Sequence, residues 1–175
     1  LARLDLKPGD SLLEIGCGWG SLAETAVQKQ GVKYHGITLS SEQKSYTNAR
    51  LPTPAEASAK LTDYRDVTQI YDAIASVEMV EAVGQRYWPD YLATISRCLK
   101  PVGRAAIQYI RIEDDVFDAY ARGTDFIQHY IFPGGMLPSV ERLQAAVERT
   151  GMSFAVDKMF GKSYARTLHE WAKRF

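Results

Sequence analysis

The feature that most constrains the fold is the glycine-rich segment LLEIGCGWGSLAE, residues 12–24. An apolar run that reaches Glu14 is followed by Gly16, Gly18 and Gly20 and then by a helical pattern. A strand, turn and helix of this kind bring backbone N–H groups and a helix N-terminus close to a ligand, with which a Cβ would collide. We therefore expect a ligand at this turn; the alternative is a glycine-rich turn that binds nothing.

The glycine spacing argues against a dinucleotide as that ligand. A dinucleotide fingerprint has the spacing G-x-G-x-x-G and an acidic residue about 20 positions further on. Ser21 stands where the third glycine would be, and the second β-like run ends in GITLS, residues 36–40, without an acid. NAD is therefore disfavoured.

Short β-like runs alternate with helical patterns along most of the chain. The runs cover residues 11–15, 33–39, 59–62, 72–78 and 103–112, and the helical patterns cover 20–30, 41–51 and 87–99. This alternation predicts parallel βαβ units and hence an α/β fold, a doubly wound, mainly parallel sheet with flanking helices. Residues 1–175 are expected to form one domain.

The last third of the chain is less regular. Residues 113–138 are aromatic and irregular, which suggests a lid-like insert. Ser139 is then expected to cap a helix over 140–150, residues 152–160 are a candidate sixth strand, and a helix is expected over 164–175.

Charge and cysteine content exclude several classes of function. The 21 basic and 21 acidic residues balance, so no overall field draws the chain to nucleic acid. Cys17 and Cys98 are too few for a disulfide scaffold, and they, like the three histidines, lack metal-ligand spacing. With no apolar run of about 18 residues, we expect a cytoplasmic protein whose membrane contact is at most local.

At the glycine turn the sequence resembles motif I, E-x-G-x-G-x-G, of class I S-adenosylmethionine-dependent methyltransferases. Six blocks in order resemble the cyclopropane fatty acid synthase family: LEIGCGWG, GITLSSEQ, DYRDV, SVEMVEAVG, FIQHYIFPGGMLPS and YARTLHEWAKRF. They span essentially the whole chain. The resemblance implies a class I methyltransferase, Rossmann-like fold and S-adenosylmethionine as cofactor.

The resemblance also implies which residues bind that cofactor. Glu14 and the backbone of Gly16, Cys17 and Gly18 would face its amino acid part, and Trp19 would pack beside the cofactor. Thr38 and Gln43 would hold the ribose, and Asp63, Tyr64 and Arg65 would read the adenine. Gly20, Leu39, Ser40 and Ser76 complete the expected cofactor site. A surface ion pair between Asp63 and Arg65 and a core role for Trp19 are the alternatives. Cys17 is expected to fill space in the turn rather than to act as a nucleophile.

In this family the acceptor is the double bond of a lipid acyl chain, and a bound bicarbonate removes the proton that lets a cyclopropane ring close. The resemblance places its anchors at Glu81 and Tyr164, with Gln108 and Ile110 beside them. Glu78 and Glu81 follow an apolar run, where acids are also common as solvated residues or helix caps. Glu81 must be protonated or offset by donors such as Tyr164 to hold an anion.

Two departures from the family pattern affect this chemistry. Ala82 stands where many members have histidine, and Gln108 replaces a second histidine. Glutamine can donate a hydrogen bond to an anion but cannot shuttle protons. Methylation of the alkene without ring closure therefore stays open.

The resemblance implies unsaturated phospholipid as partner and peripheral membrane contact, and a homodimer is possible. The apolar side chains of residues 116–137 could line an acyl channel, and Arg111, Arg122, Lys158 and Lys162 could meet lipid phosphates. The alternatives are a methyltransferase for a small soluble acceptor and a binding domain without activity. Family members have N-terminal helices and a final strand beyond this sequence, so we expect a fragment that retains its cofactor weakly.

Overall fold

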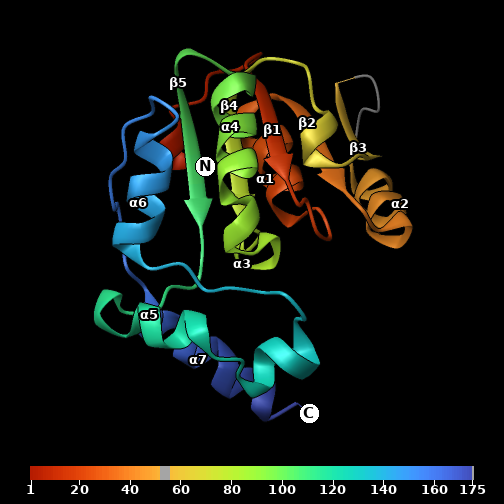
Figure 1. The fold of residues 1–175 in the computed structure, drawn as a ribbon. Helices are drawn as coiled ribbons and strands as arrows, with labels where there is room; N and C mark the ends of the chain where they lie inside the picture. Colours follow the sequence, from red (N-terminus) through yellow and green to blue (C-terminus); the bar gives the residue numbers. More distant parts are fainter. Residues whose placement is uncertain (52–55, 175) are drawn as a thin grey trace.

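The computed structural model describes residues 1–51 and 56–174. Its five described strands form one parallel sheet in the order β3-β2-β1-β4-β5 (Figure 1). Their bounds are β1 Ser11–Ile15, β2 Lys33–Thr38, β3 Ala57–Leu61, β4 Tyr71–Val77 and β5 Leu99–Gln108. The predicted doubly wound α/β fold is thereby confirmed.

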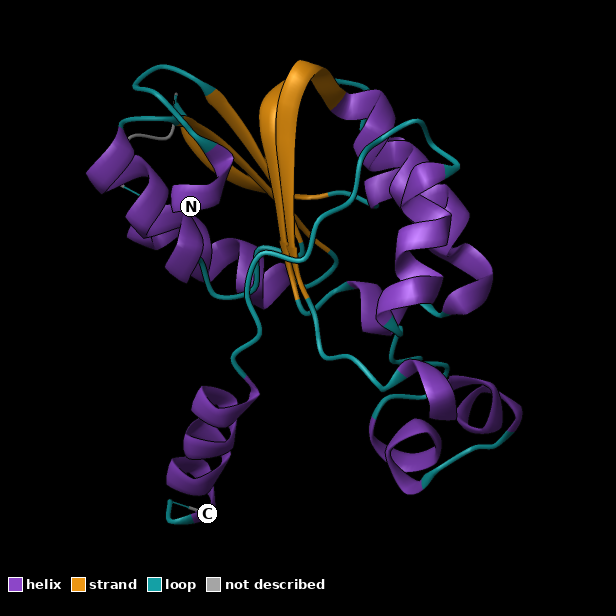
Figure 2. Ribbon diagram, turned by 90° about the vertical axis from the view of Figure 1, so that its left-hand side faces the viewer, coloured by secondary structure: helices purple, strands orange, loops and turns teal. Residues whose placement is uncertain are grey.

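Helices cover both faces of this sheet (Figure 2). The α-helices are α1 Ser21–Gln30, α2 Ser41–Arg50, α3 Val80–Val83, α4 Trp88–Cys98, α5 Asp114–Arg122, α6 Val140–Glu148 and α7 Gly161–Ala172. Three 3-10 turns, η1 Ala2–Leu4, η2 Tyr64–Asp66 and η3 Gln85–Tyr87, and a π-helical turn, η4 Ile127–Ile131, complete the described elements. Ser40 and Ser139 cap α2 and α6, each accepting a backbone N–H with its hydroxyl.

Two apolar cores lie on opposite faces of the sheet. Because side chains alternate along a strand, Leu12 of β1 joins one core, with the buried alanines of α1, and Leu13 joins the other. The second core also takes the buried faces of α4 and α6, including Leu92 and Leu143. Burial of both faces explains why β1 and β4 are almost continuously apolar.

Three sequence predictions about elements are corrected by the structure. The insert 113–138 is largely helical, because the acids of its first turn and buried Phe117 support α5. Residues 152–160 form no strand; they have no neighbouring strand with which to exchange hydrogen bonds among the described residues. Strand β5 begins at Leu99 rather than at residue 103, and ends at Gln108.

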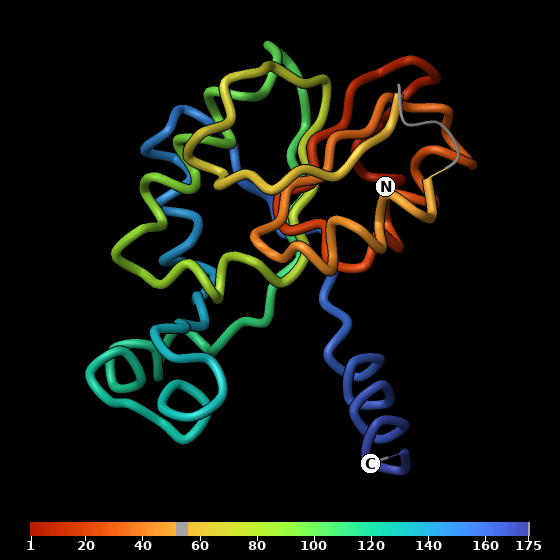
Figure 3. Tube along the Cα trace, turned by 90° about the vertical axis from the view of Figure 1, so that its right-hand side faces the viewer, coloured from red at the N-terminus to blue at the C-terminus, as the bar shows by residue number. Residues whose placement is uncertain are grey.

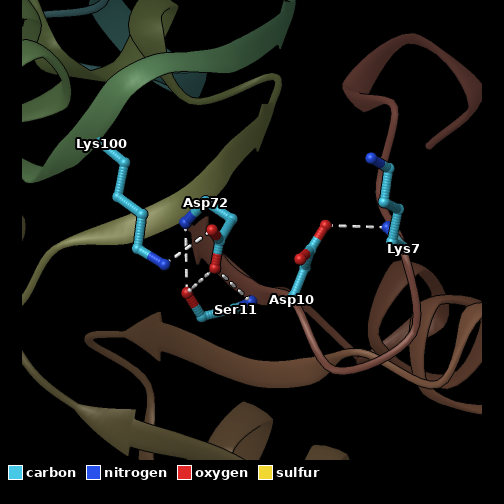
Figure 4. A network of polar contacts seen from close by, with 5 residues as sticks. All are labelled: Lys7, Asp10, Ser11, Asp72 and Lys100. Carbon is cyan, nitrogen blue, oxygen red and sulfur yellow. Dashed lines mark hydrogen bonds and ion pairs between the residues drawn. The ribbon is translucent and has the colours of Figure 1, made fainter.

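A polar network fastens the amino ends of the strands (Figure 4). Asp72 at the start of β4 accepts hydrogen bonds from the Ser11 backbone N (2.9 Å) and from the Ser11 hydroxyl (2.7 Å), and its other oxygen contacts Lys100 Nζ at 2.6 Å. These bonds hold the carboxylate charged and lower the pKa of Asp72 to about 2. The network therefore joins β1, β4 and β5 at the edge opposite the glycine turn.

The insert and α7 project beyond the carboxyl edge of the sheet (Figures 1 and 3). Phe117 packs against Trp88 of α4, with ring centroids 6.3 Å apart, and so attaches the insert to the core. Within the described ranges, no helix combines the length and apolar character needed to cross a membrane.

Candidate functional site

The glycine turn has the backbone conformation that its glycines predict. Gly16, Gly18 and Gly20 all have positive φ, between +52° and +80°, which side-chain-bearing residues rarely adopt. A Cβ on Gly20 would lie 2.8 Å from Thr47 Cγ2, whereas one on Gly18 would meet nothing within 4 Å. Backbone conformation and packing on α2 thus require these glycines, and only at Gly18 is there open space beside the turn.

The backbone N–H groups of the turn are partly used within the protein. The N–H groups of Gly16 and Cys17 both donate to the carbonyl of Ile37, at 3.0 Å, and so bind the turn to β2. Two of the N–H groups expected near the cofactor's amino acid part thus already have a partner within the protein. Cys17 is buried and its pKa is raised to about 11 by burial, which fits the expected filler rather than a nucleophile.

Glu14 is a buried carboxyl at the centre of the sheet. Only 3% of it is exposed, and its Oε2 accepts a hydrogen bond of 2.5 Å from the Tyr34 hydroxyl. Burial raises the pKa of Glu14 to about 7, and the bond from Tyr34 opposes that rise only in part. Tyr34 reaches it because Gly36 has no Cβ, which would lie 2.5 Å from the tyrosine oxygen. Sequence reasoning missed Tyr34; its place two residues before a strand glycine was the available signal.

The residues expected at the ribose come together at the end of β2. The Thr38 hydroxyl donates to Gln43 Oε1 at 2.7 Å and accepts from the Ser40 backbone N at 3.1 Å. Leu39 between them is 77% exposed. A hydroxyl and an amide thus occupy the position where dinucleotide-binding folds place an acid.

The residues expected at the adenine form a compact turn after β3. Asp63 caps η2 and forms a bidentate ion pair with Arg65, which holds the pKa of Asp63 below its ordinary value. The ion-pair alternative is therefore present in this structure. Tyr64 packs edge to face on buried Tyr91, with ring centroids 5.5 Å apart, and Ser76 is buried with its hydroxyl donating to the Ile15 carbonyl.

Trp19 does not belong to the core. It is 55% exposed and packs edge-on against Tyr46 at 5.4 Å, while Arg50 donates to its carbonyl oxygen. The core alternative for Trp19 is wrong. Trp19 of the glycine turn and Leu39 after β2 are thus both exposed apolar side chains.

Glu81 lies on α3, where the chain leaves β4. Its Oε1 accepts a 2.5 Å hydrogen bond from the Ile110 backbone N, and its own carbonyl accepts from Met136 N of the insert at 2.8 Å. Its Oε2 is buried and has no hydrogen-bond partner in the described part of the chain. Burial raises the pKa of Glu81 above its ordinary value.

Glu78 gathers the donors that were expected to serve Glu81. Gln108 Nε2 donates to Glu78 Oε1 at 3.2 Å, and the Tyr164 hydroxyl lies 3.5 Å from Glu78 Oε2. In this structure Tyr164 thus contacts Glu78 and not Glu81, and Glu78 is exposed, as the solvated-acid alternative expects. Glu78 also has φ +51°, a conformation of high energy for a residue with a side chain.

All these residues meet at one edge of the sheet. Parallel strands end on the same side, so the glycine turn after β1, Thr38 of β2, Asp63 after β3, Ser76 of β4 and Gln108 of β5 share the carboxyl edge. Open α/β sheets bind ligands at this edge. Two concavities of about 400 and 210 Å³ lie elsewhere, between α4 and α6, and none of the predicted site residues lines them.

The sheet order, the positive-φ glycine turn and the carboxyl-edge residues together define a class I methyltransferase fold. The family described as mycolic acid cyclopropane synthetase matches residues 1–175, and the chain belongs to this family.

Curated relatives agree with this assignment. Tuberculostearic acid methyltransferase UfaA1 of Mycobacterium tuberculosis is 37% identical over 174 residues, which are 97% of this chain and 40% of the relative. Cyclopropane-fatty-acyl-phospholipid synthase of Escherichia coli K12 is 35% identical over 175 residues, 99% of this chain and 44% of the relative. The chain therefore spans less than half the length of these relatives.

Solved structures show the same architecture. The cyclopropane synthase MmaA2 from Mycobacterium tuberculosis has a TM-score of 0.89 at 29% identity, covering 98% of this chain and 65% of that one. The mycolic acid cyclopropane synthase CmaA1, complexed with SAH and CTAB, has a TM-score of 0.87 at 27% identity and the same coverage.

Proposed function

We propose that this protein transfers the methyl group of S-adenosylmethionine to the double bond of an unsaturated phospholipid acyl chain, and that loss of a proton then closes a cyclopropane ring. Family membership and the relatives' names support this reaction. The observation that carries it is Glu81: a half-buried carboxyl with one oxygen held by Ile110 N, the other buried without a partner in the described part of the chain, and a raised pKa.

The residues at the carboxyl edge fit the cofactor. The open space at Gly18 admits a close approach, and Glu14 offers a buried carboxyl for an ammonium group. Thr38 and Gln43 present a hydroxyl and an amide for ribose oxygens, and Tyr64 offers a ring face for the base. S-adenosylmethionine would supply an electrophilic methyl group on a sulfonium sulfur.

In the proposed reaction the alkene carbon forms a bond to that methyl carbon as the sulfur–methyl bond breaks, which leaves a cation on the acyl chain. The polypeptide must hold the alkene in line and exclude water, which would otherwise trap the cation. A base must then remove a proton from the transferred methyl group.

We propose bicarbonate as that base, held between Glu81 and Tyr164. The raised pKa of Glu81 favours its protonated form, whose O–H could donate to an anion. Gln108 and Tyr164 supply further donors, although both contact Glu78 in this structure and would have to change partner. Loss of turnover in bicarbonate-depleted buffer, restored by added bicarbonate, is the expected result.

Transfer is best measured with labelled cofactor and unsaturated phospholipid in detergent micelles. Label should enter the lipid with a mass gain of one CH₂ group. Glu81→Gln should lower turnover at least about a hundredfold while cofactor affinity stays within about threefold, because the bicarbonate base would lose its anchor and a positioned general base typically contributes that much or more. Glu148→Gln, an exposed glutamate on α6, is the matched control. Unchanged turnover in Glu81→Gln would remove Glu81 from the reaction.

The same assay decides between the candidate outcomes. NMR signals of ring protons indicate a cyclopropane, and a methyl or methylene branch indicates alkene methylation. The second outcome stays a candidate because the 37% identical relative is named a methyltransferase. Transfer only to small soluble acceptors would support the alternative methyltransferase. Cofactor binding without transfer to any acceptor would indicate a binding domain.

A further inference from the structure

Glu78, directly after the last paired residue of β4, has an unusual backbone conformation. Its φ is +51°, which glycine adopts freely and a residue with a side chain adopts at a cost in energy. Strain of this kind recurs at active sites, where surrounding contacts maintain it. The same conformation at exposed Val102 shows that it assigns no role by itself, so the contacts of the Glu78 side chain decide.

Three other elements bring polar groups to this side chain. From β5, Gln108 Nε2 donates to Glu78 Oε1 at 3.2 Å, and the Gln108 carbonyl accepts from the Glu78 backbone N at 2.8 Å. From α7, which lies beyond the carboxyl edge in Figure 3, the Tyr164 hydroxyl is 3.5 Å from Glu78 Oε2. From α3, Glu81 is near enough that the charge of Glu78 adds to the effect of burial in raising the Glu81 pKa. Glu78 therefore lies where β4, β5, α3 and α7 meet.

Glu78 and Glu81 differ in their access to water. Glu81 Oε1 is bound to Ile110 N, and its Oε2 is buried without a partner in the described part of the chain. Glu78 is exposed. A proton on an exposed carboxyl exchanges with water directly, whereas a proton on a buried oxygen has no such route. The geometry thus suits Glu81 to holding an anion and Glu78 to taking up a proton and releasing it.

The groups that contact Glu78 donate hydrogen bonds rather than take up protons. The amide of Gln108 donates but cannot shuttle a proton. Partial burial and the charge of Glu78 raise the pKa of Tyr164 above its ordinary value, so its hydroxyl keeps its proton at neutral pH. The proposed reaction releases a proton at this edge of the sheet, and Glu78 offers an acceptor that is connected to water.

We propose that Glu78 is a further catalytic residue, whose carboxylate receives the proton that ring closure releases and passes it to water; this role rests on the proposed function. A C–H bond of the transferred methyl group breaks, and its electron pair forms the C–C bond to the cationic carbon. The proton moves to the proposed bicarbonate and from there to a Glu78 oxygen, which restores the bicarbonate. Water then takes the proton from Glu78 and restores its carboxylate.

Glu78→Gln tests the proton transfer with little change of shape. The amide keeps the size of the side chain and an oxygen that accepts from Gln108, but it cannot take up a proton. Turnover with labelled cofactor and unsaturated phospholipid in micelles should fall about a hundredfold. The KM for lipid and the affinity for the cofactor should stay within about threefold, because neither contact is changed.

Glu78→Gly removes the carboxylate and relieves the positive φ at the same time. The Tm should rise by about 2–4 °C, while turnover falls as in Glu78→Gln. Glycine leaves space for a small carboxylate, so added formate should raise the turnover of Glu78→Gly about tenfold or more. Formate should not accelerate Glu78→Gln, whose amide fills that space, and sodium chloride at the same ionic strength should accelerate neither variant.

Val102→Gly is the matched control. Val102 has φ +60° and is fully exposed in the first half of β5. Its replacement by glycine should also raise the Tm, but turnover should stay within about twofold of wild type and should not respond to formate. Circular dichroism should show that all three variants fold, and if one Glu78 variant does not fold, the other carries the test.

Two results would overturn this role of Glu78 while the proposed function stands. One is turnover of Glu78→Gln within about twofold of wild type. The other is a slow Glu78→Gly that formate does not accelerate, because Glu78 would then only position its neighbours. Failure of the proposed function looks different: the wild-type protein would transfer no methyl group to any acyl chain, and the role of Glu78 would be wrong with it.

Discussion

At the scale of single residues, one buried and one half-buried carboxyl dominate the chemistry of the carboxyl edge. Glu14 is inside the sheet with Tyr34 as its hydrogen-bond donor, and Glu81 is half enclosed with one oxygen bonded to Ile110 N. In both cases burial raises the pKa, because a charged carboxylate loses solvation. Their positions were readable from the sequence, but their protonation behaviour depends on what surrounds them.

Glu14 makes stability depend on pH in a direction opposite to that of most carboxylates. Its pKa is about 7 in the folded protein and 4.5 ordinarily, so between these values the folded state binds more protons than the unfolded state. The contribution of Glu14 to the free energy of unfolding is fully present below pH 4.5, and it decreases by about 3 kcal/mol as pH rises through 7. Glu14→Gln should flatten this slope in a series of Tm measurements, and Glu148→Gln should leave it unchanged.

Gly20 is the glycine for which the structure predicts the largest effect of substitution. Gly20→Ala combines a positive φ with a Cβ 2.8 Å from Thr47, which is buried on α2 and cannot move away. We expect a loss of about 3 kcal/mol in the free energy of unfolding, measured by urea denaturation. Gly161→Ala, where φ is not positive and nothing lies within 4 Å, should change it by less than about 1 kcal/mol. Equal effects at both positions would contradict this account.

At the scale of elements, the two edges of the sheet have different roles. The amino edge holds the Asp72 network, which joins β1, β4 and β5, and the carboxyl edge holds the glycine turn, Glu78 and Glu81. The positive φ of Glu78 places one residue of unfavourable backbone geometry beside the candidate site; the other two in the described chain, Asp5 and Val102, lie before β1 and in the first half of β5.

The Asp72 network gives the acid dependence of stability. The pKa of Asp72 is lowered from 3.8 to about 2, so the contribution of its carboxylate to the free energy of unfolding is present above pH 3.8 and is lost as pH falls through 2. Asp72→Asn keeps an acceptor for Ser11 but loses the ion pair with Lys100, and should cost about 1 kcal/mol at pH 7. The difference from wild type should vanish near pH 2 in urea titrations. Asp66→Asn on exposed η2 should show no effect at either pH.

Doubly buried strands and amphipathic helices were predictable because their signals are local. Strands β1, β2 and β4 and helices α1, α2 and α4 follow from apolar runs and periodicity. The expected strand at 152–160 is wrong because a strand exists only with a neighbour, and the pattern of one segment cannot supply it.

At the scale of the whole molecule, acidic and basic residues are balanced. Because the net charge is zero at pH 7, mutual repulsion between molecules is weakest there. Solubility in a precipitation titration should therefore be lowest near pH 7 and rise on both sides, and Lys33→Glu should move the minimum to lower pH. A minimum far from neutrality would show that apolar exposure rather than charge controls association.

The sequence by itself determined the parallel α/β architecture, the glycine turn and the set of residues at the carboxyl edge, because parallel strands must end on the same side. It also carried the family assignment, since six motifs recur in order. Only the tertiary structure decided which donors meet which acids: Tyr34 reaches Glu14, and Gln108 and Tyr164 reach Glu78 rather than Glu81. Such pairs depend on contacts between residues 20 to 86 positions apart, and the local pattern of a chain contains no information on them.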